Sequence, residues 1–237
     1  MNDGLGWLCM AFQDEHSPSI TVKVLLSASI LGGIFVSVAL SSGYSELLID
    51  LFRYETESGN TYRQMIMASC SLLYFIRFTI CMFIFLKRKI SWFEGSLVSV
   101  LFFMMFCFFG ISAGSQPQPI GLIDMVGVFL FIGGSYINTL ADYQRFSWKR
   151  SIENKGQLYT KGLFKYAVHI NYFGDSVSYV GLALITLEPV CLYVSIGIIV
   201  NFLVLQIPML DAHLRNKYGD EFEEYTKRTK RFIPYLF

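Results

Sequence analysis

Polar residues recur in pairs at a spacing of four in the second half of the chain, which places both side chains of a pair on one helical face. The pairs are Asn138 and Asp142, Asn171 and Asp175, and Asp211 and Arg215. Each pair lies at the end of an apolar run. Asn138 is the most informative member, because it lies about one turn inside its run, where an unpaired amide is costly. The pairs indicate either a polar ligand site at one end of the helices or solvated helix ends.

Arg77 interrupts another apolar run at its centre, in the stretch SLLYFIRFT at 71–79. This position is too deep for the guanidinium to reach a lipid headgroup easily. An ionisable residue at that depth normally faces the interior of a helical bundle and pairs with another group. Tyr74 lies one turn earlier on the same face. The two residues therefore indicate either a reactive polar site or an internal salt bridge that holds helices together.

The nucleotide and hydrolase motifs of soluble enzymes are missing. There is no GxGxxG after a strand, no Walker lysine, no GxSxG elbow and no HExxH helix. The cysteines show no CxxC or His/Cys ligand spacing, so we expect neither a metal site nor a disulfide framework. A phosphorylated cofactor would have to be held by side chains of the basic stretch 145–165 and of the basic tail. The same basic surface could equally lie on anionic lipid.

The helices that must position these residues are predicted to cross a membrane. Apolar residues make up 54% of the 237 residues, charged residues only 16%, and the mean hydropathy is +0.48. The apolar runs are 20–42, 63–86, 92–115, 119–141, 173–187 and 190–210. A span needs about 20 apolar residues, so we expect an all-α integral membrane bundle of about six transmembrane helices, within a range of five to seven. The net charge of +1 argues against nucleic acid as a partner.

The positive charges predict the orientation of the chain. Fifteen of the nineteen Lys and Arg residues fall in 87–89, 145–165 and 215–231, which six spans would place on one face. Cytoplasmic loops collect such residues, so both termini and these segments are expected to be cytoplasmic, in a bacterial inner membrane or the endoplasmic reticulum. Asp124, near the start of the fourth run, is expected to be a helix-terminal residue in water.

Four motifs resemble the steroid 5-alpha-reductase family, especially its uncharacterised bacterial branch. The stretch GLFKYAVHINYFGD at 162–175 is similar to that family's Gly-Leu-Phe/Trp-x-Tyr…Asn-Tyr-Phe-Gly-Glu/Asp signature. Asn138-x-x-x-Asp142 resembles its Asn-x-x-x-Asp helix end, and Tyr74-Phe-Ile-Arg77 its Tyr-Phe-x-Arg motif. The tail at 225–234 resembles its Tyr-x-x-Arg-x-x-x-x-Ile-Pro segment. The resemblance covers 63–237 as one membrane domain, after an N-terminal segment 1–62 that carries the first span.

The resemblance implies a membrane reductase that uses NADPH to reduce a carbon-carbon double bond conjugated to a carbonyl in a steroid or lipid. Tyr74 would be catalytic, hydrogen-bonding the substrate carbonyl as an oxyanion donor, with Arg77 beside the substrate. Together with the basic loop and tail, the resemblance implies a set of cofactor-binding residues. These are Asn138, Asp142, Arg145, Lys149, Tyr159, Tyr166, His169, Asn171, Tyr172, Asp175, Asp211, His213, Tyr225, Arg228 and Arg231.

The chain also departs from the family. The family pairs its tyrosine with a glutamate from an earlier helix, for which Glu46 and Asp50 are the candidates by separation. Val168 and Ile170 stand where bacterial members usually have arginine and proline. Two alternatives therefore stay open. One is a membrane methyltransferase of the isoprenylcysteine carboxyl or phospholipid type that binds S-adenosylmethionine, and the other is a lipid-binding membrane protein without catalysis. The sequence does not assign an oligomeric state.

Overall fold

The computed structural model describes residues 19–41 and 59–236, and within these ranges it contains helices and no regular strand. The long elements are α2 (Ile20–Ser41), α4 (Thr61–Ile80) with the π-helical turn η2 (Cys81–Phe85), α5 (Trp92–Gly114), α6 (Leu122–Lys149), α7 (Ile170–Thr186), α8 (Pro189–Asn201) with the π-helical turn η5 (Phe202–Gln206), and α9 (Ile207–Tyr218). The prediction of an all-α membrane bundle is confirmed.

Five of the described helices are long and apolar enough to cross a membrane: α2, α4 with η2, α5, α6, and the continuous helix from α8 to α9. This number is at the lower end of the predicted range. The predicted fifth span is α7, which has only 17 residues and is largely buried among its neighbours. The predicted tight hairpin after α7 is present, because Leu187 is left-handed (φ 54°) and Pro189 is the first residue of α8.

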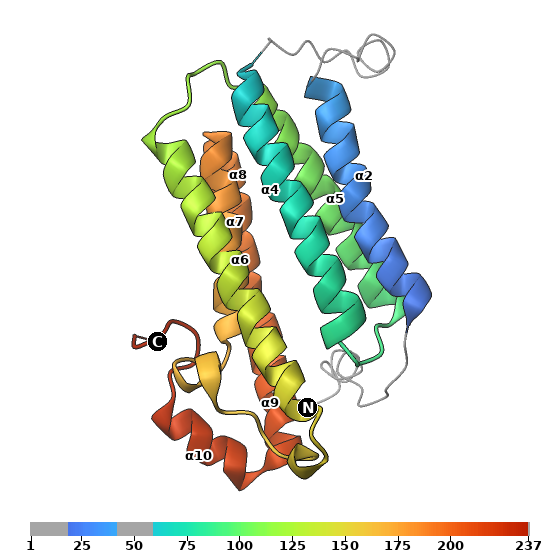
Figure 1. The fold of residues 1–237 in the computed structure, drawn as a ribbon, viewed down its shortest axis with the longest axis vertical. Helices are drawn as coiled ribbons and strands as arrows, with labels where there is room; N and C mark the ends of the chain where they lie inside the picture. Colours follow the sequence, from blue (N-terminus) through green and yellow to red (C-terminus); the bar gives the residue numbers. More distant parts are fainter. Residues whose placement is uncertain (1–18, 42–58, 237) are drawn as a thin grey trace, which may run out of the picture.

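The helices form two groups that lie side by side along the bundle (Figure 1). One group contains α2, α4 and α5, and the other contains α6, α7 and the helix from α8 to α9. Helix α7 joins the groups, since it packs against α6, α8, α4 and α5. The main apolar core gathers between them around Tyr74, Phe106, Phe131 and Leu182. The short α7 therefore presents its side chains to helices on all sides.

Glycines bring α6 and α7 into backbone contact. A Cβ atom added at Gly181 would lie 2.4 Å from the backbone nitrogen of Phe131, and one at Gly174 would lie 2.6 Å from that of Asn138. A Cβ atom at Gly134 would lie 2.4 Å from the carbonyl oxygen of Gly174. Small residues at such crossings let membrane helices approach closely. The approach holds Asn138 of α6 directly against the first turns of α7.

A buried ion pair closes the end of the bundle that carries the loop between α5 and α6. Arg63 Nε lies 2.8 Å from Asp124 Oδ1, with side chains 0% and 2% exposed. Arg63 also donates to the carbonyl oxygens of Gln116, Gln118 and Pro119. The expectation that Asp124 faces water is therefore wrong. It failed because the arginine that covers this carboxylate is 61 residues away in the chain.

The opposite end of the bundle, here called the tail end, is capped by η3 (Ile152–Asn154), η4 (Gly162–Lys165), α10 (Asp220–Arg228) and the segment after it (Figure 1). The last segment pairs with the start of α7, where Val168 N donates to Lys230 O at 2.8 Å and His169 N to Arg231 O at 3.0 Å. The basic loop and the basic tail thus meet at one end.

Replacing Gly181 by alanine should lower the melting temperature by about 2–10 °C, because the new methyl group forces α6 and α7 apart. The measurement is thermal unfolding in detergent. Gly133→Ala is the matched control on α6, since nothing lies within 4 Å of its added Cβ. Equal melting temperatures for the two variants would show that the close helix crossing is not required.

Asp124→Asn should destabilise the fold by about 3–5 kcal/mol, because it leaves the guanidinium of Arg63 buried without a counter-charge. Thermal unfolding of the single variant and of the double variant Arg63→Met/Asp124→Leu tests this. The double variant should be the more stable of the two, since it removes both charges. A single variant as stable as wild type would contradict the interpretation.

Candidate functional site

An interior polar cluster forms where α4, α6 and α7 meet, from Arg77, Asn138 and Asp175. Arg77 Nη1 donates to Asn138 Oδ1, and Arg77 Nη2 donates to Asp175 Oδ1 at 2.8 Å. Arg77 and Asn138 are 7% and 4% exposed. The prediction that Arg77 faces the bundle interior and pairs with another group is confirmed, and the partners are two residues that the sequence also singled out.

Tyr74 lies beside this cluster with its hydroxyl in the core. The Tyr74 hydroxyl is 2.8 Å from the Tyr179 hydroxyl, and the guanidinium carbon of Arg77 is 4.6 Å from the centre of the Tyr74 ring. Phe102 and Phe106 complete an aromatic wall around Tyr74, which is 1% exposed. The sequence analysis missed Tyr179, although it lies four residues after Asp175 on one face of α7.

A line of polar contacts leads from the cluster toward the tail end. Asn138 Nδ2 donates to the carbonyl oxygen of Asn171 at 3.0 Å, and the Asn171 amide lies 3.5 Å from Asp142 Oδ1. Asp142 in turn pairs with Arg145 at 2.7 Å. The two predicted i,i+4 pairs on α6 and α7 therefore face each other, and they do not act as solvated helix ends. Together they connect the bundle interior to the basic loop.

The protein does not use all the hydrogen-bonding capacity of these polar groups. Arg77 Nε is buried and has no hydrogen-bond partner in the described part of the chain. The carboxylates along the line keep accessible surface, with the side chains of Asp142 and Asp175 15% and 23% exposed. Native proteins pair nearly all buried polar atoms. The cluster therefore keeps one donor and two carboxylates whose hydrogen-bonding capacity the described residues do not fully use.

The loop and tail tyrosines have structural contacts. Tyr159 is buried against Trp148 and Phe164, and the Tyr225 hydroxyl donates to the carbonyl oxygen of Phe164 at 2.6 Å. Burial raises the pKa of Tyr159 and of Tyr225, so both stay protonated at neutral pH. The Tyr166 ring packs on the Tyr235 ring. These contacts fasten the basic loop to the tail.

His169 connects α7 to the tail. His169 Nε2 lies 2.7 Å from Asp211 Oδ1, and Arg231 Nη2 lies 2.9 Å from Asp211 Oδ2. His169 is 1% exposed, as a residue that orders a loop by hydrogen bonding would be. Its ring contacts Tyr172, which packs on Phe202 of η5. These contacts hold the start of α7, which includes Asn171, against α9 and η5.

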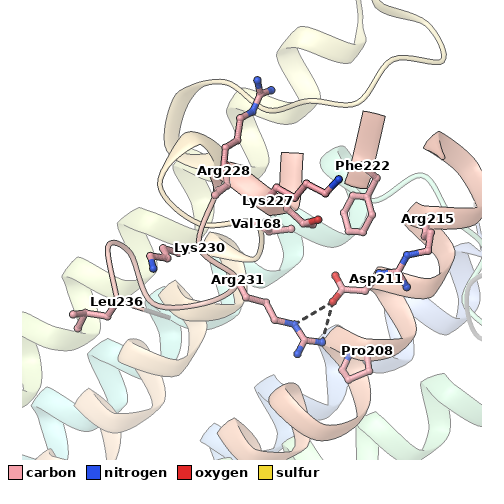
Figure 2. A pocket seen from close by; sticks show the side chains of 12 residues that line it. Val168, Pro208, Asp211, Arg215, Phe222, Lys227, Arg228, Lys230, Arg231 and Leu236 are labelled. Carbon is pink, nitrogen blue, oxygen red and sulfur yellow. Dashed lines mark hydrogen bonds and ion pairs between the residues drawn. The ribbon is translucent and has the colours of Figure 1, made fainter. Parts of the chain in front are cut away.

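A basic pocket of about 830 Å³ opens between α9, α10 and the last segment of the chain (Figure 2). Arg228 and Arg231 line it, and Arg231 reaches Asp211 on its floor. Two other predicted cofactor residues lie at this end of the protein without lining the pocket. Lys149 donates to the Tyr218 hydroxyl at 3.2 Å, and His213 lies on α9. The pocket shares no lining residue with the interior polar cluster. Ten of the predicted site residues thus fall into two separate places.

The first place holds Tyr74, Arg77, Asn138, Asp142, Arg145, Asn171 and Asp175, connected by direct contacts. The second holds Asp211, Arg228 and Arg231 around the basic pocket. Glu46 and Asp50, the candidate acidic partners of Tyr74, lie outside the described residues. In the described part of the chain no cluster of His, Cys, Asp and Glu could hold a metal ion.

The fold and the interior cluster define an all-α membrane protein with a polar cluster inside its bundle. The chain matches the family described as protein of unknown function (DUF1295) over residues 84–229, more than half of its length, and it belongs to that family.

The chain is also similar to 3-oxo-5-alpha-steroid 4-dehydrogenase 2. The proteins of Macaca fascicularis and Homo sapiens are each 30% identical to it over 112 residues, and that of Sus scrofa is 31% identical over 116 residues. Each match covers 47% of this chain and 42% of the relative, so the chain matches less than half the length of these proteins. The resemblance to the steroid 5-alpha-reductase family is confirmed.

Proposed function

We propose that this chain is a membrane oxidoreductase that reduces a carbon-carbon double bond conjugated to a carbonyl, in a steroid or lipid substrate, with NADPH as hydride donor. One observation supports it above the others: the Tyr74 hydroxyl is buried next to a cluster of Arg77, Asn138 and Asp175, from which polar groups lead to the basic end. The names of the relatives point to the same class of substrate.

Tyr74 would polarise the substrate carbonyl. Its hydroxyl can donate a hydrogen bond to the carbonyl oxygen while Tyr179 donates to Tyr74, an arrangement that the distance of 2.8 Å between the two oxygens allows. Negative charge grows on the carbonyl oxygen as the enolate forms. The guanidinium of Arg77, which is 4.6 Å from the Tyr74 ring centre, would stabilise that charge inside an apolar bundle. The aromatic wall around Tyr74 would hold an apolar ring or chain and keep water out.

The residues along the polar line fit a nicotinamide nucleotide. When bound, NADPH supplies the hydride that the reaction needs. Asn171 and Asp175 offer an amide donor and a carboxylate acceptor, which match the two kinds of hydrogen bond that a carboxamide makes. The unmet Nε of Arg77 is a further donor at the inner end. The cationic side chains of Arg145 and Lys149 lie in the last two turns of α6, at the tail end. They would bind the phosphate groups of the nucleotide.

The orientation follows from the same assignment. NADPH is a cytoplasmic metabolite, and the polar contacts lead toward the tail end, where the basic loop and tail lie. The positive charges there favour the cytoplasmic side. We therefore propose that the tail end is cytoplasmic, and that the loop between α5 and α6 faces the other side of the membrane.

Tyr74→Phe should lower kcat about 10²- to 10³-fold while the fold is retained, because the ring stays and only the hydroxyl that meets the oxyanion is lost. The measurement is NADPH oxidation in detergent with a panel of 3-oxo-4-ene steroids and 2-enoyl lipids. Tyr136→Phe is the control, since Tyr136 is 66% exposed on α6. Full activity of Tyr74→Phe would exclude the proposed role of this hydroxyl.

NADPH should raise the melting temperature of the wild-type protein more than NADH or S-adenosylmethionine does, because a ligand that binds only the folded state stabilises it. Asn138→Ala should lose most of this increment, whereas Asn216→Ala, on an exposed position of α9, should keep it. Differential scanning fluorimetry of the purified proteins measures both. An increment with S-adenosylmethionine alone would favour the methyltransferase instead.

A further inference from the structure

The basic pocket at the tail end carries more positive charge than the protein neutralises. Five cations line it with one carboxylate: Arg215, Lys227, Arg228, Lys230 and Arg231 with Asp211. Arg231 pairs with Asp211, and Arg215 pairs with Glu223. Within the residues that the structure describes, Lys227, Arg228 and Lys230 have no carboxylate partner. The pocket is therefore a cavity with unmatched positive charge.

The other lining groups suit a phosphate that has an apolar part attached. Thr229 adds a hydroxyl group to the wall, whereas the Thr226 hydroxyl already donates to the carbonyl oxygen of Glu223 at 3.0 Å. Val168, Pro208, Phe222 and Leu236 form its apolar surface. In Figure 2, Pro208 and Asp211 lie on the same helix beside the guanidinium of Arg231, so apolar and basic surfaces adjoin at this point. This combination is not needed for a free anion, but it matches the headgroup and glycerol region of a lipid.

The depth of the pocket relative to the bilayer is set by the helix from α8 to α9. Between Glu188 and Asp211 the chain has no charged residue over 189–210. These residues form a nearly continuous helix of the length that spans a hydrocarbon layer, about 30 Å. Asp211 is thus the first charged residue beyond the layer. A hydrocarbon layer that covers 189–210 would place the pocket built on Asp211 at the level of the lipid phosphates.

The end of the chain adds a second indication of a membrane surface. Tyr235 and Leu236 follow the basic segment and are 73% and 76% exposed. Aromatic and aliphatic side chains at this level commonly enter the interface between headgroups and acyl chains. Leu236 itself lines the pocket, so an inserted end would bring the pocket against the leaflet.

We infer that this pocket binds the phosphate of an anionic phospholipid from the leaflet on the tail side. Lys227 would contact the phosphate, while Lys230 and Arg228, which point in other directions in Figure 2, would add positive charge around it. The acyl chains would extend past Pro208 along α9 and η5. The bound lipid would tie α9, α10 and the last segment together. Because that segment fixes His169 and the start of α7, the lipid would also steady Asn171 in the interior site. The inference does not depend on the reaction that the interior site performs.

The test compares two phospholipids that have the same acyl chains and differ in headgroup. Each lipid is added to the full-length protein in detergent. Dioleoylphosphatidylglycerol at about ten times its Kd should raise the melting temperature by about 3–6 °C, and dioleoylphosphatidylcholine should not. Lys227→Gln/Lys230→Gln should lose most of this increment. Lys155→Gln/Lys161→Gln is the matched control, because it removes two exposed lysines from the basic loop outside the pocket, and it should keep the increment.

Native mass spectrometry of the wild-type protein gives a readout that does not depend on the variants, and it should show more phosphatidylglycerol than phosphatidylcholine adducts. Equal shifts with the two lipids would overturn the inference, as would equal loss in the two double variants, which would mean diffuse attraction to charge. A shift with 2′,5′-ADP but not with phosphatidylglycerol would also overturn it and assign the pocket to the nucleotide.

Discussion

The burial of Arg77 inside an apolar bundle is the constraint on which the site depends. Removing a guanidinium from water costs several kcal/mol, and hydrocarbon offers no partner for it. The protein must supply oxygens from other helices, and it does so with Asn138 of α6 and Asp175 of α7. The same two contacts hold the α4 group against the α6 and α7 group. One cation therefore fixes both the position of Tyr74 and the seam between the two halves of the bundle.

The approach of α6 to α7 makes those contacts possible. Gly134, Gly174 and Gly181 remove the side chains that would separate the helices, so that the Asn138 amide reaches the backbone of Asn171. A wider spacing would leave Asn138 and Asp142 facing lipid or each other. Packing of small residues, which carries no chemistry itself, thus decides that the two polar pairs meet. This dependence links the stability of one helix crossing to the geometry of the candidate site.

The sequence predicted the parts of this protein that depend on local pattern. Apolar run lengths located every described long helix, and the depth of Arg77 and Asn138 in their runs marked them as interior groups. The spacing of the residues located the polar pairs on α6 and α7. It did not show that Arg77 of α4 contacts them, because Arg77 and Asp175 are 98 residues apart in the chain. Asp124 was misjudged for the same reason, since only the fold brings Arg63 to it. Tyr179 had a local signal, its spacing from Asp175, which was overlooked among the apolar residues of α7.

The two arginines that are buried in the described part of the bundle, Arg63 and Arg77, differ in how fully the protein uses their donors. Arg63 donates to both oxygens of Asp124 and to three carbonyl oxygens, so its fork of donors is used within the protein. Arg77 has the same chemistry and similar burial, yet its Nε has no partner among the described residues and the carboxylate of Asp175 keeps accessible surface. A bundle that needed Arg77 only for cohesion would gain by closing that gap, as it did at Arg63. The open donor of Arg77 and the fully used donors of Arg63 support the proposal that the interior cluster holds a polar ligand.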